Sequence, residues 1–348
     1  MSFPPLYKLL DWIPVEKLEM REVSEQPEAV EFLRENPEYI DWQTITSNSA
    51  AVSIMENNID KIDFSWLSSK AHGVHLLKKY KERINWHDFS VNPAGISLIE
   101  ENLDKVDWTM LSQNENAIHI LENNLDKINW ECLCQSNDNC ISFIEKHIDK
   151  IHWDVLSSNE DALHLLKSRP DKIDYRRLSY NRNPQVIPML FDNMSKIGMD
   201  WFCSRSEPEV LEYIEKNFLD ILFNPEGNKS YYEHQCTLRA ICSNKDLFYM
   251  VEEYIADLIG ILRRGFWESL CENENEKAIE LLKSNQDKID WKRLSRNPLI
   301  FELDTQKMKS RCAPFAQELA AYVYSPSRLM RLCEKYDVEM STLLEIFE

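Results

Sequence analysis

Residues 104–130 read DKVDWTMLSQNENAIHILENNLDKINW, and the stretch opens and closes on nearly the same phrase, Asp-Lys-(Val/Ile)-(Asp/Asn)-Trp. Its two tryptophans, Trp108 and Trp130, are 22 residues apart. Large apolar residues recur at about this spacing along most of the chain, so the stretch is one copy of a tandem repeat. We take the following residues as the anchors of the copies: Met20, Trp42, Phe64, Trp86, Trp108, Trp130, Trp153, Tyr175, Trp201, Trp267 and Trp291. A degraded copy without an aromatic anchor falls at residues 238–255.

The residues around each anchor predict a short helix. An apolar residue stands three positions later, as Leu111 does after Trp108, and these two positions share one face of a helix. The residue before the anchor is usually Asp or Asn, as at Asp107, and such side chains cap the first turn of a helix. Each anchor therefore opens a helix of one to two turns.

A second helix follows in each copy. Pairs such as Asn92-Pro93 and Asn159-Glu160 suit its start, and apolar residues then recur at offsets that form one helical stripe. Its small first residue, such as Gly95, is expected to let neighbouring second helices approach closely. Asparagines at its end suit a left-handed cap, and they are Asn58, Asn102 and Asn124.

One such pair of helices cannot bury its apolar stripe alone, so the copies must stack. We predict an all-α fold, an α-solenoid of about twelve repeats with terminal caps. At roughly 8–10 Å between packed helices, the result would be a curved rod on the order of 100 Å along its arc. The expected segments are a cap at 1–19, regular repeats at 20–218, an irregular insertion at 219–266, two further repeats at 267–310 and a helical cap at 311–348.

Composition narrows the function further. The net charge of −19 disfavours nucleic acid as a general partner. The apolar run at 255–262 is too short to span a bilayer, and we expect no membrane association. Nine cysteines, none in a CxxC pair, suit a reducing compartment.

Histidines recur at His75, His119 and His164, but they are too far apart to share an ion and are expected to face solvent. Because residues needed in every copy serve the fold, we predict no metal, no cofactor and no enzymatic activity.

The phrase NWHDFSVNPAGISLIEENLDKVDW at 85–108 fits the pattern DWxxLSxNPxAIxLLExNxDKI. This pattern resembles that of tandem-repeat proteins of giant DNA viruses of amoebae and algae, and residues 9–20 and 315–340 resemble the ends of those proteins. The chain departs from it at two anchors, Met20 and Phe64, and at 219–266. The resemblance implies a viral protein located in the host cytoplasm or associated with the virion, and it implies no activity.

Candidate partner contacts come from positions that vary between copies. The position two after the anchor gives Trp66, Met110, Cys132 and Val155, either as an apolar strip for a partner or as packing within the repeats. Arg177 belongs to a basic cluster, and Tyr231 and Tyr232 lie in the insertion. The basic residues form two sets: Arg169, Lys172, Arg176, Arg177 and Arg182, and Arg263, Arg264, Lys292, Arg293 and Arg296. They are either solvated faces or sites for an acidic segment of a partner.

These observations favour a non-enzymatic scaffold or adaptor that binds a protein, viral or host, during infection, as a monomer or weak oligomer. A structural component of the virion is the first alternative. An enzyme with its site in the 219–266 segment is the second.

Overall fold

The computed structural model describes residues 4–135, 140–223 and 231–315, with Tyr322, Ser325, 328–331 and Cys333 beyond them. The chain divides into two units. The terminal unit consists of residues 1–8 and 302–348, and the repeat unit of Leu9–Phe301. Two short strands, β1 (Tyr7–Leu9) and β2 (Phe301–Leu303), pair with each other. Every other regular element of the described residues is helical, which confirms the all-α prediction.

The repeat unit contains twelve repeats, and each begins with a helix or, in one case, a 3₁₀ turn. The first helices are α1 (Met20–Ser24), a 3₁₀ turn at Thr44–Ser47, α4 (Phe64–Ser68), α6 (Trp86–Phe89), α8 (Trp108–Leu111), α10 (Trp130–Gln135), α12 (Trp153–Leu156), α14 (Tyr175–Leu178), α16 (Met199–Cys203), α18 (Tyr231–Ser243), α21 (Arg264–Leu270) and α23 (Trp291–Leu294). Asp107 shows why they start where they do. Its Oδ1 accepts bonds from the backbone N–H of Thr109 at 2.9 Å and of Met110 at 3.0 Å.

Eleven repeats continue into a second helix. These helices are α2 (Val30–Glu35), α3 (Val52–Glu56), α5 (Val74–Lys79), α7 (Ile96–Glu100), α9 (Ile118–Glu122), α11 (Ile141–Glu145), α13 (Leu163–Ser168), α15 (Ile187–Phe191), α17 (Pro208–Phe223), α19 (Phe248–Glu253) and α22 (Glu276–Lys283). In the last repeat a 3₁₀ turn at Pro298–Ile300 leads into β2 instead. Two helices fall outside this scheme, α20 (Ile255–Leu262) in the repeat unit and α24 (Thr305–Cys312) in the terminal unit.

Short 3₁₀ turns join these helices. Those just before a second helix are Pro27–Ala29, Ser49–Ala51, Ala71–Gly73, Pro93–Gly95, Glu160–Ala162, Pro184–Val186 and Lys245–Leu247. Those in the loops that follow are Pro37–Tyr39, Ile59–Lys61, Lys81–Arg83, Leu125–Lys127, Ile148–Lys150, Pro170–Lys172 and Gln286–Lys288. Two more, Val15–Lys17 and Ala313–Phe315, lie near the ends of the chain.

The predicted left-handed cap after the second helix is wrong. Asn58 and Asn124 have φ of −137° and −142°. Each amide instead donates to a carbonyl four residues earlier, that of Ile54 or Ile120, at 2.9 Å. Among the described non-glycine residues Arg263 alone has a positive φ, 53°. The asparagine therefore ends the helix by satisfying a free carbonyl, and no left-handed residue is needed.

The core of each repeat is the residue three positions after the anchor. Leu111 and Phe89 are fully buried, whereas Trp108 is only half-buried. A lysine from the following loop covers the exposed side of the indole, with Lys127 Nζ 4.3 Å from the ring centroid of Trp108. Most tryptophan anchors thus form the edge of the core, not its centre.

The small residue just before each second helix, such as Gly95, was expected to let neighbouring second helices approach, but it makes room for a side chain instead. A Cβ added at Gly95 would lie 2.6 Å from Cζ of Phe89, and one at Gly73 would lie 2.3 Å from Cδ1 of Leu67. The missing side chain therefore makes room for the core residue of the same repeat, not for a neighbouring second helix.

Neighbouring repeats are joined by two recurring sets of hydrogen bonds. Ser90, four positions after its anchor, accepts the backbone N–H of Asp107 in the next repeat at 2.9 Å. Asn114, six positions after its anchor and 2% exposed, donates to the carbonyls of Ser90 and Asn92 in the preceding repeat, both at 3.0 Å. The same amide bonds join further repeats through Asn48, Asn92, Asn181, Asn244, Asn273 and Asn297. A buried ladder of asparagines thus fixes the spacing of the repeats.

The ladder also corrects one anchor. Gly198 N–H donates to Ser179 Oγ at 3.0 Å, so Gly198 is the residue before the anchor and Met199 is the anchor itself. Phe202, three positions later, is fully buried, whereas Trp201 is 44% exposed. Trp201 was therefore assigned wrongly as an anchor and stands two positions after it.

The predicted insertion at 219–266 contains longer helices that keep the same register. The last turn of α18 places Ile241 and Cys242 in the buried positions, and the carbonyl of Cys242 accepts from the next asparagine at 2.8 Å. Leu238 thus fills the anchor position of this repeat. Residues 224–230 of this segment lie outside the described residues.

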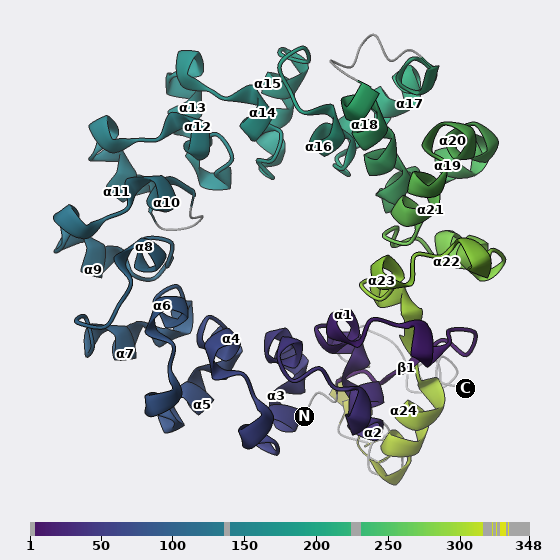
Figure 1. Ribbon diagram of the computed structural model, residues 1–348, viewed down its shortest axis with the longest axis horizontal. Helices are drawn as coiled ribbons and strands as arrows, with labels where there is room; N and C mark the ends of the chain where they lie inside the picture. The colour runs from purple at the N-terminus through teal and green to yellow at the C-terminus, as the bar shows by residue number, and fades with distance from the viewer. Residues whose placement is uncertain are drawn as a thin grey trace. The chain divides into compact units, whose positions relative to one another are not determined.

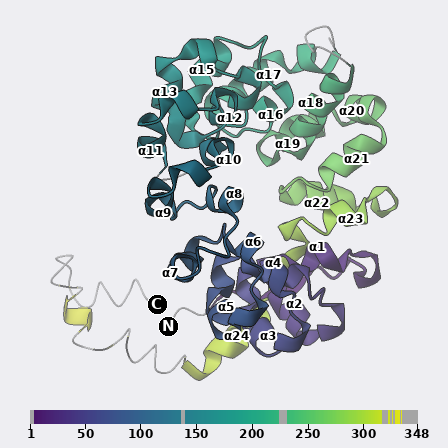
Figure 2. The same ribbon diagram turned by 60° about the vertical axis from the view of Figure 1, so that its left-hand side comes forward.

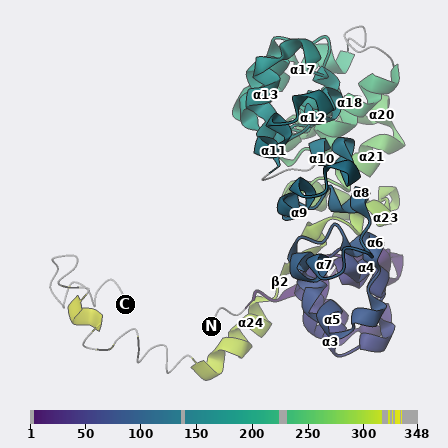
Figure 3. The ribbon, with the colours of Figure 1, turned by 90° about the vertical axis from the view of Figure 1, so that its left-hand side faces the viewer.

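Within the repeat unit the first helices lie on the inner side of the curve and most second helices on the outer side (Figure 1). Seen from the side, α7, α9, α11 and α13 follow one another along the unit (Figure 3). The predicted curved rod closes on itself, because the first repeat contacts the last. Figures 1 and 2 show α1 beside α23, and Glu19 N–H donates to Ser295 Oγ at 2.9 Å. Small rotations between neighbours, summed over twelve repeats, bring the two ends of the unit together.

Candidate interaction surface

The first helices form a continuous surface on the inner side of the repeat unit (Figure 1). We call it the inner face and define it as the side chains one, two and five positions after each anchor. These positions take no part in the asparagine ladder. The residue directly after the anchor is exposed in most repeats, as at Arg21, Ser65, His87, Thr109, Glu131, Asp154, Arg176, Arg239 and Lys292. Where these side chains are exposed, they can vary without disturbing the fold.

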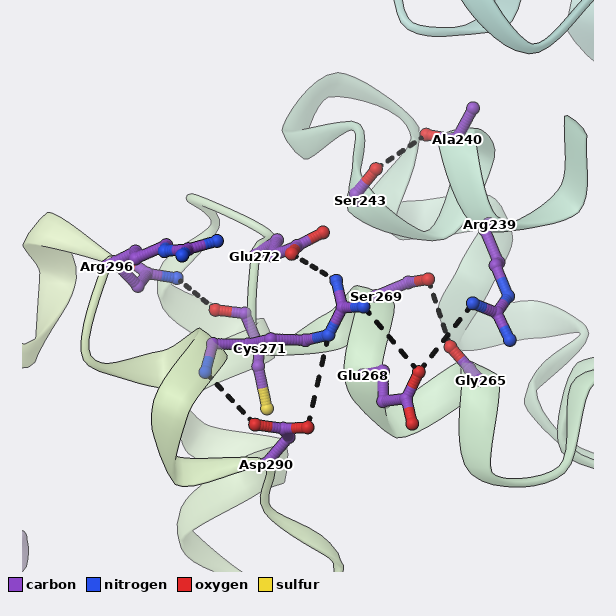
Figure 4. Close-up of polar contacts among 12 residues, drawn as sticks. Arg239, Ala240, Ser243, Gly265, Glu268, Ser269, Cys271, Glu272, Asp290 and Arg296 are labelled. Carbon is purple, nitrogen blue, oxygen red and sulfur yellow. Dashed lines mark hydrogen bonds and ion pairs between the residues drawn. The ribbon is translucent and has the colours of Figure 1, made fainter. Parts of the chain in front are cut away.

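One part of the inner face carries a network of charges from three consecutive repeats (Figure 4). Glu268 on α21 lies 3.6 Å from Arg239 Nη1 and 3.8 Å from Arg293 Nη2. Arg293 also pairs with Glu272, and Arg264 Nε lies 3.0 Å from Glu268 Oε1. The second basic set is therefore largely neutralised by its own chain, which favours its interpretation as a structural network.

A different pair occupies the equivalent positions between α14 and α16. The rings of Tyr180 and Trp201 lie 4.2 Å apart between centroids, at 34° to each other. They are 42% and 44% exposed. Arg177 Nη2 is 3.7 Å from Asp154, and Arg176 has no ion pair with any described residue. Exposed Trp, Tyr and Arg side chains are the types that most often dominate protein interfaces.

A cavity of about 280 Å³ lies near Trp201, although neither ring of the pair lines it; Arg176 and Gly198 are part of its wall. A Cβ at Gly198 would lie 3.2 Å from Asp200 Oδ1 and 3.8 Å from both Arg176 Cγ and Trp201 Cδ1, so a side chain there would crowd the cavity wall. The remaining walls are Met194, Ser195, Ile197, Met199, Asp200, Tyr232, Glu233, Cys236 and Thr237. A hydrogen bond with the Cys236 thiol raises the pKa of Tyr232, whose hydroxyl thus stays protonated at neutral pH. The cavity can hold an apolar side chain with a polar group at its edge.

The structure separates the residues predicted to contact a partner. Trp66, 37% exposed, lies under Arg21, whose Cζ is 5.8 Å from the ring centroid. Val155 is buried at 2%, so it packs within the repeats and offers no partner contact. Met110 and Cys132 are half-buried, and Arg177, Tyr231 and Tyr232 are exposed. Of these, Tyr232 lines the cavity, and Arg177 directly follows Arg176, which also lines it.

The two most exposed aromatic residues of the inner face, Tyr180 and Trp201, were missed. Trp201 was taken for an anchor because it is aromatic, and Tyr180 was not singled out. The lysine three positions before an anchor could have corrected the register. Lys196 Nζ lies 4.9 Å from the ring centroid of Tyr175, as Lys127 lies over Trp108, and it therefore marks Met199 as the next anchor.

The recurring histidines are exposed and pair with glutamates of the preceding repeat. His75 Nε2 lies 3.0 Å from Glu56 Oε1, and His119 Nε2 lies 2.8 Å from Glu100 Oε1. Among the described residues no group of three or more His, Cys, Asp or Glu side chains could hold a metal ion. The histidines thus link neighbouring repeats at the surface.

Two buried cysteines take the place of a junction serine. Cys134 and Cys271 replace the serine four positions after the anchor. Burial raises the pKa of Cys134 to about 11 and that of Cys271 to about 12, while a backbone hydrogen bond from the next repeat lowers each. Both thiols are therefore protonated at neutral pH and poor nucleophiles.

No protein-family model, curated protein or solved structure matches this chain. In the part of the chain that the structure describes, no helix is both long enough and apolar enough to cross a membrane. The interaction surface therefore rests on the geometry of this chain alone.

Proposed function

We propose that the protein is a non-enzymatic scaffold or adaptor that binds a protein partner on its inner face. The sequence resemblance to repeat proteins of giant viruses supports a role in the cytoplasm of an infected cell. The partner is viral or host protein.

The observation that carries the proposal is the exposed pair of Tyr180 and Trp201. At the equivalent positions between α21 and α23, Glu272 and Arg293 pair with each other. Here the two aromatic rings remain 42% and 44% exposed. Arg176, in the wall of the nearby cavity, has no ion pair with any described residue. Burying such rings against a partner removes apolar area from water at little cost in side-chain entropy.

The test is co-purification of the tagged protein from infected cells, followed by mass spectrometry. The wild type should retain a protein partner in stoichiometric amounts. A double variant, Tyr180→Ala with Trp201→Ala, should lose the partner by roughly a hundred-fold, as expected when two interface hot spots are removed. The matched control is Tyr249→Ala, which removes a 49% exposed tyrosine from α19.

Retention of the partner by the double variant would refute the assignment of this site. Absence of any stable protein partner for the wild type would refute the adaptor itself. Recovery of the protein in stoichiometric amounts from purified particles would favour a structural component of the virion.

A further inference from the structure

The first and last repeats meet at a junction that we call the seam. It is formed by Lys17, Glu19, Glu22 and Gln26 on one side and Trp291, Ser295 and Arg296 on the other. Glu19 and Ser295, which are joined by a hydrogen bond across the seam, are 276 residues apart in the chain. The seam is therefore the one junction of the twelve whose two sides no loop connects.

The seam repeats the bonding of the internal junctions. Glu19 N–H donates to Ser295 Oγ at 2.9 Å, as Asp107 N–H donates to Ser90 Oγ. Gln26 stands at the ladder position and donates to the carbonyl of Ser295. Lys17 Nζ lies 5.0 Å from the ring centroid of Trp291, in the same relation as Lys127 and Trp108. The front of the first repeat thus fits the back of the last as any repeat fits its neighbour.

The seam is less complete than the junction at Asn114. Asn114 makes two bonds to the preceding repeat, and its Oδ1 accepts the N–H of Asn116 at 3.1 Å. Gln26 makes one such bond, and its buried Oε1 has no partner among the described residues. A groove of about 840 Å³ follows the seam and is lined by both sides, including Glu25 and Lys292. The longer glutamine side chain thus leaves polar groups and space unfilled.

An exposed ion pair adds to the contact. Arg296 Nε and Nη2 lie 2.7 and 2.8 Å from the two carboxylate oxygens of Glu22. These hydrogen bonds from Arg296 lower the pKa of Glu22. The pair occupies the positions that Arg293 and Glu272 occupy in the preceding junction, with the charges exchanged. The seam therefore has a charge order of its own that distinguishes it from that junction.

We infer that the seam is exchangeable: its two sides pair with those of a second copy of the chain, giving a dimer in which each first repeat docks on the partner's last repeat. The contacts of the seam are formed again in such an exchange, including the pairing of β1 with β2, and a smaller rotation at each internal junction would let two chains close together. At low protein concentration the closed monomer is favoured over the dimer, because the two sides of the seam are held close together within one chain. High protein concentration or refolding favours the exchanged dimer.

The test uses charge reversal at the seam. Glu22→Arg places two arginines face to face within one chain, and Arg296→Glu places two glutamates face to face. In an exchanged heterodimer of the two variants, both seams again pair opposite charges. The variants are unfolded in guanidinium chloride, refolded together, and sized by light scattering against twice 41.2 kDa.

The mixture should contain more dimer than either variant refolded alone, by roughly ten-fold or more, because two like-charge contacts become two ion pairs. The Glu22→Arg and Arg296→Glu double variant should refold as a monomer, since it restores closure within one chain. A matched control mixes Glu272→Arg with Arg293→Glu, which reverses an internal junction whose sides a loop connects, and no excess of heterodimer should form. Circular dichroism on each variant verifies folding.

Two results would overturn the inference. One is a mixture of folded seam variants with no more dimer than the single variants. The other is an equal excess of heterodimer in the control mixture, because association would then not depend on the seam.

Discussion

Asn114 provides the most direct test of the asparagine ladder. It is 2% exposed, and its amide donates to the carbonyls of Ser90 and Asn92, both at 3.0 Å. Its Oδ1 accepts the N–H of Asn116 at 3.1 Å. Asn114→Ala removes all three bonds and leaves the buried carbonyl of Ser90 and the N–H of Asn116 without a partner, whereas the carbonyl of Asn92 still accepts the N–H of Gly95 at 3.0 Å. At about 1 kcal/mol for each lost bond, the free energy of unfolding should fall by about 3 kcal/mol.

The assay is guanidinium chloride denaturation followed by circular dichroism and tryptophan fluorescence. The matched control is Asn123→Ala, which removes an exposed amide that donates only to the carbonyl of His119, at 2.8 Å. The control should lose less than about 0.5 kcal/mol. Hydrogen exchange would show whether the loss is confined to the repeats around α8, as expected for a protein whose repeats contact only their neighbours.

A loss for Asn114→Ala no larger than that for Asn123→Ala would refute the reasoning. The ladder would then be a consequence of stacking and would not stabilise it.

Three further predictions concern packing, pH and thiol reactivity. Gly95→Ala should lower the free energy of unfolding by about 1–3 kcal/mol, because the added Cβ overpacks the core. Gly260→Ala, with nothing within 4 Å of the added Cβ, should be neutral or stabilising by up to about 1 kcal/mol. Chemical denaturation compares the two variants, and equal effects would contradict the close contact at Gly95. The pKa of Glu22 is lowered in the folded chain, so its contribution to the free energy of unfolding is present above its ordinary pKa of 4.5 and is lost as the pH falls below that value. The Glu22→Gln variant should therefore lose stability less steeply than the wild type between about pH 5 and pH 3 in acid titrations. An unchanged slope would contradict this. The exposed Cys312 should react with a disulfide reagent at neutral pH far faster than Cys134, whose pKa is raised to about 11, as measured by mass spectrometry of labelled peptides; similar rates would contradict the burial.

The repeat itself could be predicted because its signals are local. Asp107 as a cap, Leu111 as core and Asn92 at the start of a second helix follow from residue type and spacing within a few positions. The junction bonds were not predicted. The same asparagine that caps a turn through Oδ1 also reaches the preceding repeat through its amide, and only the stacked structure shows this second role.

Closure of the repeat unit could not be predicted from the sequence. It depends on the rotation between neighbouring repeats, which no single residue determines. With the structure known, Lys17 and Gln26 can be recognised as the missing half of a junction, since they stand at the same offsets from Met20 as their counterparts from later anchors.

The candidate surface was predicted only in part. Arg177, Tyr231 and Tyr232 are exposed, and Trp66 remains on the inner face. Val155 follows the second alternative, packing within the repeats, because it is only 2% exposed. The position two after the anchor is buried in some repeats and exposed in others, and a one-dimensional pattern does not show which.

Closure of the twelve repeats is the central structural claim, and one distance measures it. Spin labels can be attached through a ketone-bearing unnatural residue at the exposed positions Glu16 and Lys292, which leaves the native cysteines unchanged. In the monomer, pulsed electron resonance should give a label separation of less than about 30 Å, because neighbouring repeats are roughly 10 Å apart. A separation beyond about 60 Å would mean an open run of repeats, and it would contradict both the closed unit and the seam.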